Sequence, residues 1–269
     1  MKHPQSVGLA LGSGAFRGFA HIGVIKVLEK KGVAIDYIAG SSIGAWIAAY
    51  YAVFQDIRRL ENDLLADPKG GLAAFIDPSL IGGFIGGRKL NSYLEKSLGR
   101  HSFSSLKIPL RIVATDLISG LPFIFKEGDV AKAVRASTSV PLVFRPESYQ
   151  NKLLVDGALS NPVPVGALKE MGAKSVIAVN LYHRNEFVNR KFTMSKIALR
   201  SMRIVIHNLA KVDIKEAAAV IEPDCSPFIK KEGWGKYFTT EVIAALITIG
   251  EEAAERAWPA IERALAEGK

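Results

Sequence analysis

Ser42 lies at the centre of the pentapeptide Gly-Ser-Ser-Ile-Gly, residues 40–44, which separates two apolar segments. The spacing G-x-S-x-G between a strand and a helix is typical of a nucleophile elbow, a sharp turn that exposes the serine hydroxyl. Gly40 and Gly44 allow the turn, because a Cβ would clash there. We therefore predict that Ser42 is a nucleophile at a helix N-terminus, where the helix dipole favours developing negative charge.

A glycine-rich loop, residues 12–18, follows the first apolar segment of the chain. One interpretation is an oxyanion hole, whose backbone N–H groups each contribute about 3–4 kcal/mol to transition-state stabilisation. Small residues let an ester carbonyl approach such donors closely. The donors would come from Gly12, Ser13, Gly14 and Ala15.

The same loop also fits a variant dinucleotide-binding fingerprint. Its glycines would be Gly12, Gly14 and Gly18, and Asp36 stands near the position of a ribose-binding acid. However, the elbow follows the very next predicted strand. The carboxyl ends of adjacent parallel strands share one edge of a sheet, where sites form, so the oxyanion hole is the favoured interpretation.

A serine hydroxyl needs a base to remove its proton. The chain has five histidines, and none follows a strand end and a glycine turn: His3, His21, His101, His183 and His207. Asp156 ends a predicted strand and precedes Gly157-Ala158. Partial desolvation would raise its basicity, although a carboxylate here could also merely cap the turn. Beside the elbow and the glycine loop, the catalytic role is favoured.

The elements that must position these residues begin with a strand over 7–11, a helix ending at Gly32, a strand over 33–39 and a helix over 43–54. This β-α-β-α order predicts a parallel sheet with helices on its faces. Further helices are predicted over 90–98, 163–171, 193–219 and 240–264, and one that Asp129 caps and that runs to about 137. Further strands are predicted over 110–114, 123–125, 175–180 and 220–221, and residues 149–155 contain a polar turn at Gln150-Asn151 followed by an apolar strand.

Composition narrows the class of protein. The 269 residues are 49% hydrophobic and 23% charged, which fits one globular α/β domain with a sizeable core. The single cysteine, Cys225, excludes an intramolecular disulfide and a cysteine-rich metal site. The net charge of +9 favours anionic partners. No zinc finger or RNA-binding motif accompanies it, so we expect no nucleic acid.

The three motifs together resemble the patatin-like phospholipases, over roughly residues 7–180. In this chain they are the loop 12–18, the elbow 40–44 and the triplet Asp156-Gly157-Ala158, and a further similar element comprises Arg135-Ala136-Ser137 with Val140-Pro141. The resemblance implies a three-layer α/β/α fold with a mainly parallel central sheet. It also implies a Ser42–Asp156 dyad without histidine and without metal or cofactor.

By the same resemblance, the chain is a serine acyl hydrolase that cleaves lipid esters of phospholipase or lysophospholipase type through an acyl-enzyme. Arg17 and Gly18 would anchor the oxyanion loop. Ser13, Ala15 and Phe16 interrupt a loop that is often nearly all glycine in the family, so Phe16 is expected to reshape the acyl entrance. We expect a single domain over 1–269, with a motif-bearing core over 7–180 and a helical part over 193–269.

The N-terminal residues and one apolar loop predict where in the cell the protein acts. No secretory signal is visible at residues 1–6, so we expect a cytoplasmic protein. The apolar loop over 72–85, with Arg88 and Lys89 nearby, is either a flap that contacts the inner face of an anionic membrane or a loop packed on the core. Three alternatives stay open: a non-catalytic lipid-binding adaptor, a nucleotide-binding oxidoreductase and a hydrolase with a histidine base.

Overall fold

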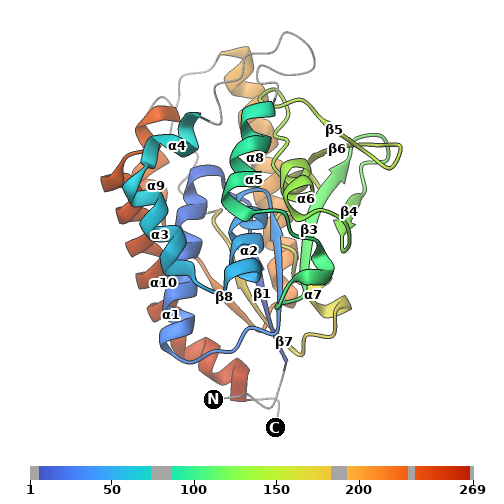
Figure 1. Ribbon diagram of the computed structural model, residues 1–269. Coiled ribbons are helices and arrows are strands. Elements are labelled where there is room, and N and C mark those ends of the chain that lie inside the picture. The colour runs from blue at the N-terminus through green and yellow to red at the C-terminus, as the bar shows by residue number, and fades with distance from the viewer. Residues whose placement is uncertain (1–5, 74–86, 183–192, 230–233, 267–269) are drawn as a thin grey trace.

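A central sheet, which has eight strands within the described residues, organises the molecule (Figure 1). The computed structural model describes residues 6–73, 87–182, 193–229 and 234–266. The strands are β1 (Val7–Leu11), β2 (Tyr37–Ser41), β3 (Leu110–Asp116), β4 (Pro122–Phe125), β5 (Glu147–Tyr149), β6 (Lys152–Asp156), β7 (Ser175–Val179) and β8 (Ala219–Ile221). The neighbours β8, β7, β1, β2 and β3 are parallel, whereas β4 and β6 run antiparallel to β3 and β5 runs antiparallel to β6.

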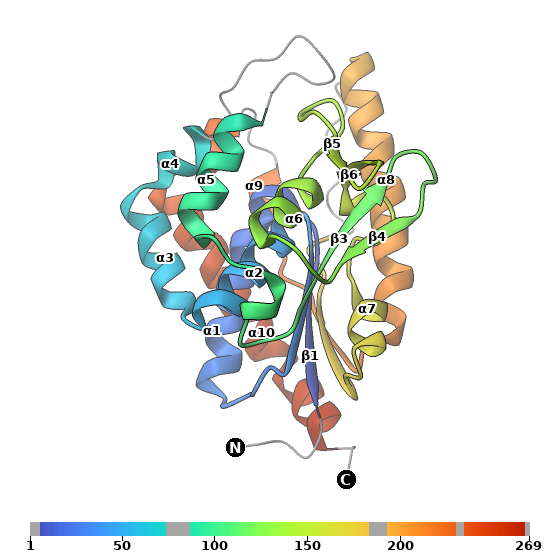
Figure 2. The same ribbon diagram turned by 45° about the vertical axis from the view of Figure 1, so that its right-hand side comes forward.

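Helices cover both faces of this sheet (Figure 2). They are α1 (Ala20–Lys30), α2 (Ile43–Phe54), α3 (Ile57–Ala66), α4 (Pro68–Ala73), α5 (Arg88–Leu98), α6 (Val130–Ser137), α7 (Val165–Glu170), α8 (Met194–Asp213), α9 (Ser226–Ile229) and α10 (Thr240–Ala266). Helices α1, α2 and α10 pack on one face, and α7 and α8 lie on the other. The prediction of a three-layer α/β/α fold is therefore confirmed. None of the helices in these described ranges is long and apolar enough to span a bilayer.

The side chains of β1 alternate between the two cores, as strand geometry requires. Leu9 and Leu11 belong to the core beneath α1 and α10, whereas Ala10 faces the smaller core beneath α7 and α8. Small residues on the second face let α7 approach, since a Cβ on Gly8 would lie 3.2 Å from the Cβ of Leu168 in α7. The short apolar run in the sequence thus serves both layers.

Strand β2 begins at Tyr37 rather than at the predicted Val33. Gly32, with φ of +73°, closes α1, and the chain then runs as a loop to Asp36. The Asp36 carboxylate accepts the Val7 N–H at 2.7 Å, and the Asp36 N–H donates to the Val7 carbonyl. These bonds at the start of β1 replace the strand pairing that the apolar pattern predicted, and β2 instead continues to Ser41, directly before the elbow.

Two other predictions concern a turn and a loop. The chain turns at Gln150-Asn151, as predicted, and both residues have positive φ; this turn joins β5 and β6 in an antiparallel hairpin. Most of the apolar loop over 72–85 lies outside the described residues, so its role as a flap stays a prediction.

Helices α1 and α10 touch at small residues. A Cβ on Gly23 would clash with the Ile247 carbonyl, and a Cβ on Gly250 would clash with the Ala20 carbonyl. The two backbones can therefore approach only because these positions carry glycine. This contact joins the last long helix of the chain to the layer that supports the first strand.

Replacing Gly250 with alanine should lower the free energy of unfolding by about 1–3 kcal/mol, because the added methyl group overpacks the contact. Urea denaturation measures the loss. The control is Gly166→Ala on the exposed side of α7, where a Cβ meets no atom within 4 Å. That change should raise stability by up to about 1 kcal/mol. Equal losses in both variants would contradict the packing role of Gly250.

Candidate active site

The turn at Ser42 has the strained geometry of a nucleophile elbow. Ser42 has φ of 55° and ψ of −124°, an unfavourable conformation for a residue with a Cβ. The flanking glycines make the turn sterically feasible. A Cβ on Gly40 would clash with the Gly44 carbonyl, and a Cβ on Gly44 would clash with the Leu11 carbonyl at the end of β1. The G-x-S-x-G spacing therefore follows from how closely β1, β2 and α2 meet.

Strand β3 brings the serine and the carboxylate together. Ser41 pairs with Val113, and Asp156 pairs with the next residue, Ala114. Strand β4 pairs with β3 over the same residues and so occupies its other edge, which means that β2 and β6 share one edge and meet end to end. The Ser42 Oγ, one residue beyond β2, donates a hydrogen bond of 2.6 Å to Asp156 Oδ2.

Further contacts hold the Asp156 carboxylate in place. Its second oxygen, Oδ1, accepts the Ala158 N–H at 2.8 Å, and Thr115 Oγ1 donates to the Asp156 carbonyl at 2.8 Å. Gly157 must be glycine, since a Cβ would clash with the Val113 carbonyl and lie 2.7 Å from Ser41 Oγ. The Asp-Gly-Ala triplet thus turns the chain tightly against the end of β2.

Burial sets the basicity of Asp156. Only 3% of the residue is exposed, and desolvation raises its pKa from 3.8 to about 6. The hydrogen bonds from Ser42 and the Ala158 N–H act in the opposite direction, because they favour the ionised form. The carboxylate is consequently more basic than an ordinary aspartate and still ionised at neutral pH.

The glycine-rich loop lies at the adjacent strand end, but its N–H groups are not equivalent. The Gly12 N–H donates to the Val179 carbonyl at 3.0 Å, and the Ser13 N–H donates to the Pro162 carbonyl at 2.8 Å. These bonds differ from the prediction that Gly12, Ser13, Gly14 and Ala15 would all point at a ligand. Within the described part of the chain, the N–H groups of Gly14 and Ala15 have no recorded partner. Of the four predicted donors, these two are therefore left for a ligand.

Buried side chains anchor this loop from behind. Arg17 donates to the Gly14 carbonyl at 2.9 Å and to the Leu181 carbonyl at 3.0 Å, and its guanidinium lies 4.8 Å from the centre of the Tyr182 ring. Tyr182 also shares a hydrogen bond of 2.8 Å with Ser13 Oγ. The sequence indicated Arg17 as an anchor, whereas no pattern pointed to Tyr182.

Gly18 and His21 fix the helical end of the loop. A Cβ on Gly18 would clash with the Ile43 side chain, the residue after the elbow serine. His21 is fully buried, and its Nε2 donates to the Gly12 carbonyl at 2.7 Å. Burial lowers the His21 pKa to about 4, so the ring is neutral at pH 7. We infer that His21 supports the loop rather than acting as a base.

The other histidines have different surroundings. The His101 ring packs edge-on against Phe54, and His207 is buried within α8 on the opposite face of the sheet from α2. His3 and His183 lie outside the described residues. The hydroxyl of Ser42 is hydrogen-bonded to a carboxylate instead.

The dinucleotide interpretation also depended on an acid near the glycine loop. Asp36 instead binds the Val7 N–H, at the start of β1, whereas Gly12 follows the end of that strand. A carboxylate at the opposite end of the strand cannot bind a ribose at the loop.

The end of α6 holds both halves of the Ser–Asp pair by their backbones. Ser137 Oγ accepts the Ser42 N–H at 2.8 Å, and the Ser139 carbonyl accepts the Asp156 N–H at 3.0 Å. The sequence had marked Arg135-Ala136-Ser137 only as a family-like element. Its structural role depends on contacts across roughly a hundred residues, which no local pattern encodes.

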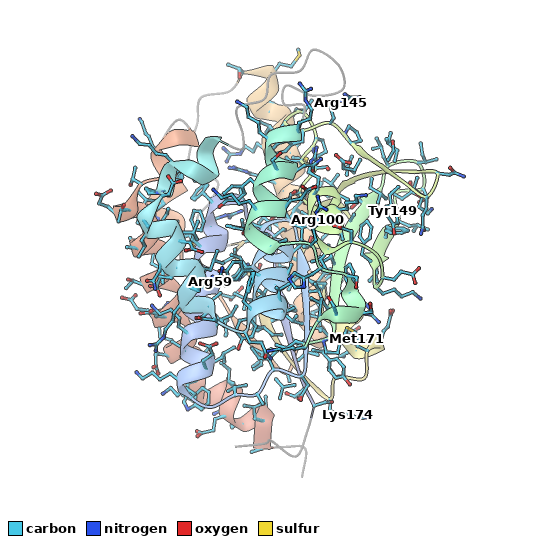
Figure 3. All side chains as sticks on the ribbon, in the orientation of Figure 1. Arg59, Arg100, Arg145, Tyr149, Met171 and Lys174 are labelled. Atoms are coloured by element: carbon cyan, nitrogen blue, oxygen red, sulfur yellow. The ribbon has the colours of Figure 1, made fainter. Side chains whose placement is uncertain are left out.

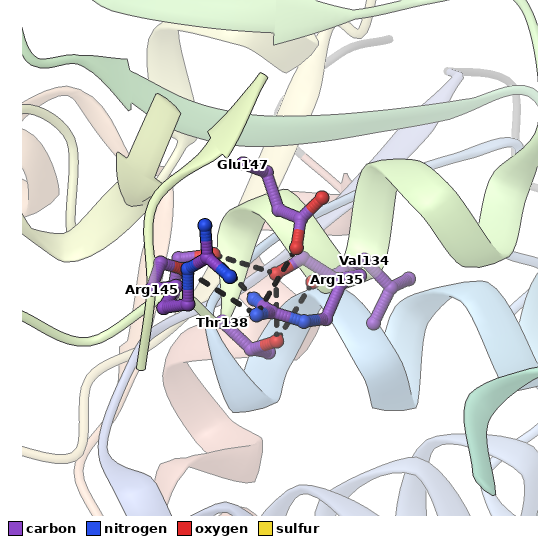
Figure 4. A network of polar contacts seen from close by, with 6 residues as sticks. Val134, Arg135, Thr138, Arg145 and Glu147 are labelled. Carbon is purple, nitrogen blue, oxygen red and sulfur yellow. Dashed lines mark hydrogen bonds and ion pairs between the residues drawn. The ribbon is translucent and has the colours of Figure 1, made fainter. Parts of the chain in front are cut away.

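An ion pair between a buried arginine and a partly exposed glutamate fixes this end of α6 (Figure 4). The Arg135 guanidinium donates to Ser139 Oγ at 2.6 Å and to the Arg145 carbonyl at 3.3 Å, and it lies 3.1 Å from Glu147 Oε1. Burial lowers the pKa of Arg135, while Glu147 opposes that effect. Figure 3 shows Arg145 and Lys174 towards opposite ends of the molecule, so the network lies towards the end where the parallel strands finish.

An apolar cavity of about 90 Å³ opens beside the serine. It is lined by Ala15, Phe16, Phe19, Ser42, Ile43, Trp46, Leu64, Leu90, Tyr93, Leu94, Thr138, Val140, Phe144 and Phe238. The nucleophile candidate and the oxyanion loop therefore face one space, and that space suits a hydrocarbon chain.

The C-terminal part of the chain closes this cavity. The rings of Phe16 and Tyr237 stack with centroids 3.6 Å apart, and Phe19 meets Phe238 edge-on at 6.0 Å. Phe16, which interrupts the glycine loop in the sequence, is thus part of the cavity wall. No motif in the C-terminal third predicted this contribution.

Comparison with known proteins identifies the family of this chain. A family model described as Patatin-like phospholipase matches residues 9–169. An uncharacterized NTE family protein of Mycobacterium bovis is 35% identical over 176 residues, which are 65% of this chain and 49% of that protein. Patatin-like phospholipase domain-containing protein 6 of Mus musculus is 30% identical over 189 residues, 68% of this chain and 14% of that protein. The chain spans half or less of the length of these curated relatives.

Lysophospholipase NTE1 of Debaryomyces hansenii is 30% identical over 181 residues, 66% of this chain and 12% of that protein. Among solved structures, VipD from Legionella pneumophila superposes with a TM-score of 0.50 at 13% identity, over 96% of this chain and 67% of that one, which supports the fold alone. The matched family region contains the glycine loop, the elbow and the Asp156 turn. The chain belongs to the patatin-like phospholipase family.

Proposed function

We propose that this protein is a serine acyl hydrolase that cleaves lipid esters through a Ser42–Asp156 dyad. The observation that carries the proposal is the 2.6 Å hydrogen bond from Ser42 Oγ to Asp156 Oδ2 at the wall of an apolar cavity. A hydroxyl and a base in direct contact can transfer a proton without an intermediary. The cavity supplies room for an acyl chain beside the reacting atom.

The proposed reaction has two steps. Asp156 takes the Ser42 proton while Oγ attacks the ester carbonyl carbon, and the N–H groups of Gly14 and Ala15 stabilise the oxyanion that forms. The proton then passes to the departing alcohol, and an acyl-enzyme remains on Ser42. In the second step Asp156 takes a proton from water, whose oxygen attacks the acyl carbon. Fatty acid leaves, and the serine hydroxyl is restored.

The substrate class follows from the cavity and the charge. Its lining is almost entirely apolar, which fits a fatty acyl group, and two relatives are named as a phospholipase-domain protein and a lysophospholipase. The net charge of +9 favours contact with an anionic membrane that would hold such lipids. We therefore propose a phospholipase or lysophospholipase activity at a membrane surface.

Replacing Ser42 with alanine should abolish hydrolysis of short acyl esters and labelling by a fluorophosphonate probe, because the nucleophile is removed. Esterase assays and mass spectrometry of the labelled peptide measure both effects. The matched control is Ser41→Ala, which removes a buried hydroxyl without a hydrogen-bond partner among the described residues. It should keep most of the activity. Unchanged hydrolysis by the Ser42 variant would contradict the proposal and favour a non-catalytic, lipid-binding role.

The rate should fall as the pH drops through about 6, because Asp156 must be ionised to accept the proton and burial raises its pKa to about 6. A pH profile of kcat/KM on a soluble ester tests this. If kcat/KM instead fell near pH 4, the range in which an exposed aspartate titrates, the result would contradict a buried base.

The same burial predicts that Asp156→Asn is inactive but more stable. A raised carboxyl pKa stabilises the fold below the unfolded-state pKa and loses that contribution as pH rises through about 6. Above about pH 7 the variant should therefore unfold with a free energy larger by about 3 kcal/mol, and the gap should close below about pH 4. Urea denaturation at both pH values measures it, and a constant gap would refute the linkage.

Replacing Ser137 with alanine should lower kcat by about ten- to a hundredfold with little change in KM. The Ser42 N–H would lose its buried acceptor, and the elbow would no longer be held in position. Steady-state kinetics measure the split. The control is Ser175→Ala on β7, another buried serine whose Oγ donates to the Ala264 carbonyl at 3.3 Å. It should alter stability alone, and equal kcat losses in both variants would contradict a positioning role.

A further inference from the structure

Helix α8 is apolar on two faces. Its inner face contributes Ile206 and Ala210 to the core beneath the sheet, where they pack with Val163 and Val165. Its outer face is also apolar but exposed. Of the nine large apolar side chains that the described residues expose, five belong to α8: Met194, Ile197, Ile204, Val205 and Val212.

The exposed residues form one stripe. Spacings of three, four, seven and eight residues place side chains on the same side of a helix, and Ile197, Ile204, Val205 and Val212 follow that pattern. From Met194 to Val212 the stripe extends for roughly 27 Å at 1.5 Å per residue. Val205 and Val212 are 56% and 59% exposed, so neither is covered by the described part of the fold. A buried interior helix is apolar all round, but a surface helix with this stripe needs an apolar partner.

Positive charge borders the stripe. Arg200 lies three residues after Ile197 and four before Ile204, and Lys211 lies seven residues after Ile204, so both cations neighbour exposed apolar side chains. The acid in this helix, Asp213, is directed inward, since its carboxylate accepts the Val163 N–H at 2.9 Å. The outer face therefore combines apolar and cationic groups.

We propose that the outer face of α8 lies in the interface of an anionic lipid bilayer, with its axis parallel to the membrane plane. Apolar side chains in the acyl boundary and basic side chains at anionic headgroups are the two contributions that hold such a helix. A second copy of α8 fits less well, because pairing the stripes would bring their bordering cations together. The inference rests on the proposed lipid-ester activity, for which it names the docking surface.

The same helix also packs beside the turn that follows the proposed base. Helix α8 packs against the 3-10 helix Gly157–Leu159 that directly follows Asp156, and Ala158 belongs to the core that the inner face of α8 completes. Figure 2 shows α8 along the face of the sheet opposite α1 and α10. Docking through α8 would thus place the membrane beside the turn that follows Asp156, on the opposite face of the sheet from the core that contains Trp46 and Leu90 of the cavity lining.

Vesicle flotation of the full chain tests the proposal, with vesicles of phosphatidylcholine alone and of phosphatidylcholine with phosphatidylglycerol. The protein should float with the anionic vesicles and be released as salt rises, because the headgroup contribution is screened. The double variant I204Q/V205Q should lose at least about tenfold in binding, since it removes two large apolar side chains from the contact. It should still hydrolyse a soluble ester at the rate of the unchanged protein.

The matched control is the double variant I118Q/L121Q, which removes two exposed apolar side chains, 81% and 65% exposed, from the β3–β4 turn. It should bind vesicles normally. Equal loss in both variants, or unchanged binding by I204Q/V205Q, would overturn the proposal. So would dimerisation in sedimentation that I204Q/V205Q abolishes without vesicle binding by the unchanged protein.

These results are separable from the proposed activity. If fluorophosphonate fails to label Ser42 while flotation still depends on Ile204 and Val205, the hydrolase proposal fails and the docking surface stands. If Ser42 is labelled but flotation is independent of α8, the docking proposal alone fails.

Discussion

The site depends on one edge of β3 being shared by two strands. Ser41 of β2 pairs with Val113 and Asp156 of β6 pairs with Ala114, while β4 occupies the opposite edge over the same stretch. Two strand ends that meet on consecutive residues bring their following turns into contact. The hydrogen bond between Ser42 and Asp156 spans 114 residues of sequence. The pairing of both strands with β3 nevertheless places the two side chains next to each other.

Bringing the ends of β2 and β6 together costs free energy, and contacts from the surrounding residues offset that cost. The carboxylate of Asp156 is buried, which disfavours its ionised form, and Ser42 is held in a strained turn. Ser137 and Ser139 satisfy the two backbone N–H groups, and Arg135 fixes the segment that carries them. A strained serine and a buried carboxylate persist because the neighbouring structure determines their positions several times over.

How far the sequence predicts this structure differs from residue to residue. Strand β1 and helix α2 have the predicted bounds, because each is an apolar run that a glycine-containing turn delimits. The spacing of the family-like motifs led to Ser42 and Asp156. The engagement of the Gly12 N–H was not predictable, since it depends on a carbonyl of β7 more than 160 residues away.

Contacts between distant segments explain why the sequence did not predict other features of the site. Phe238 lines the cavity and Tyr237 stacks on Phe16, another lining residue, although their segment carries no motif. They reach the glycine loop because α10 packs on α1 and brings its preceding turn there. The outer stripe of α8 was hidden for a different reason. A helix that is apolar on two faces looks in sequence like a buried helix, and only the exposure of Val205 and Val212 distinguishes the faces.

Among the residues that the structure describes, Ser42 binds a carboxylate rather than a histidine, and the proposed mechanism gives this choice a physical explanation. A general base works best when its pKa lies near the operating pH, and an ordinary aspartate is too weak a base for this. Burial raises the pKa of Asp156 to about 6, close to the value of about 6.5 that a histidine has without any perturbation. Burial has the opposite effect on His21, whose pKa it lowers to about 4, and the His21 ring binds a loop carbonyl. The same low-dielectric environment therefore makes the carboxylate the better base and leaves the imidazole a neutral support.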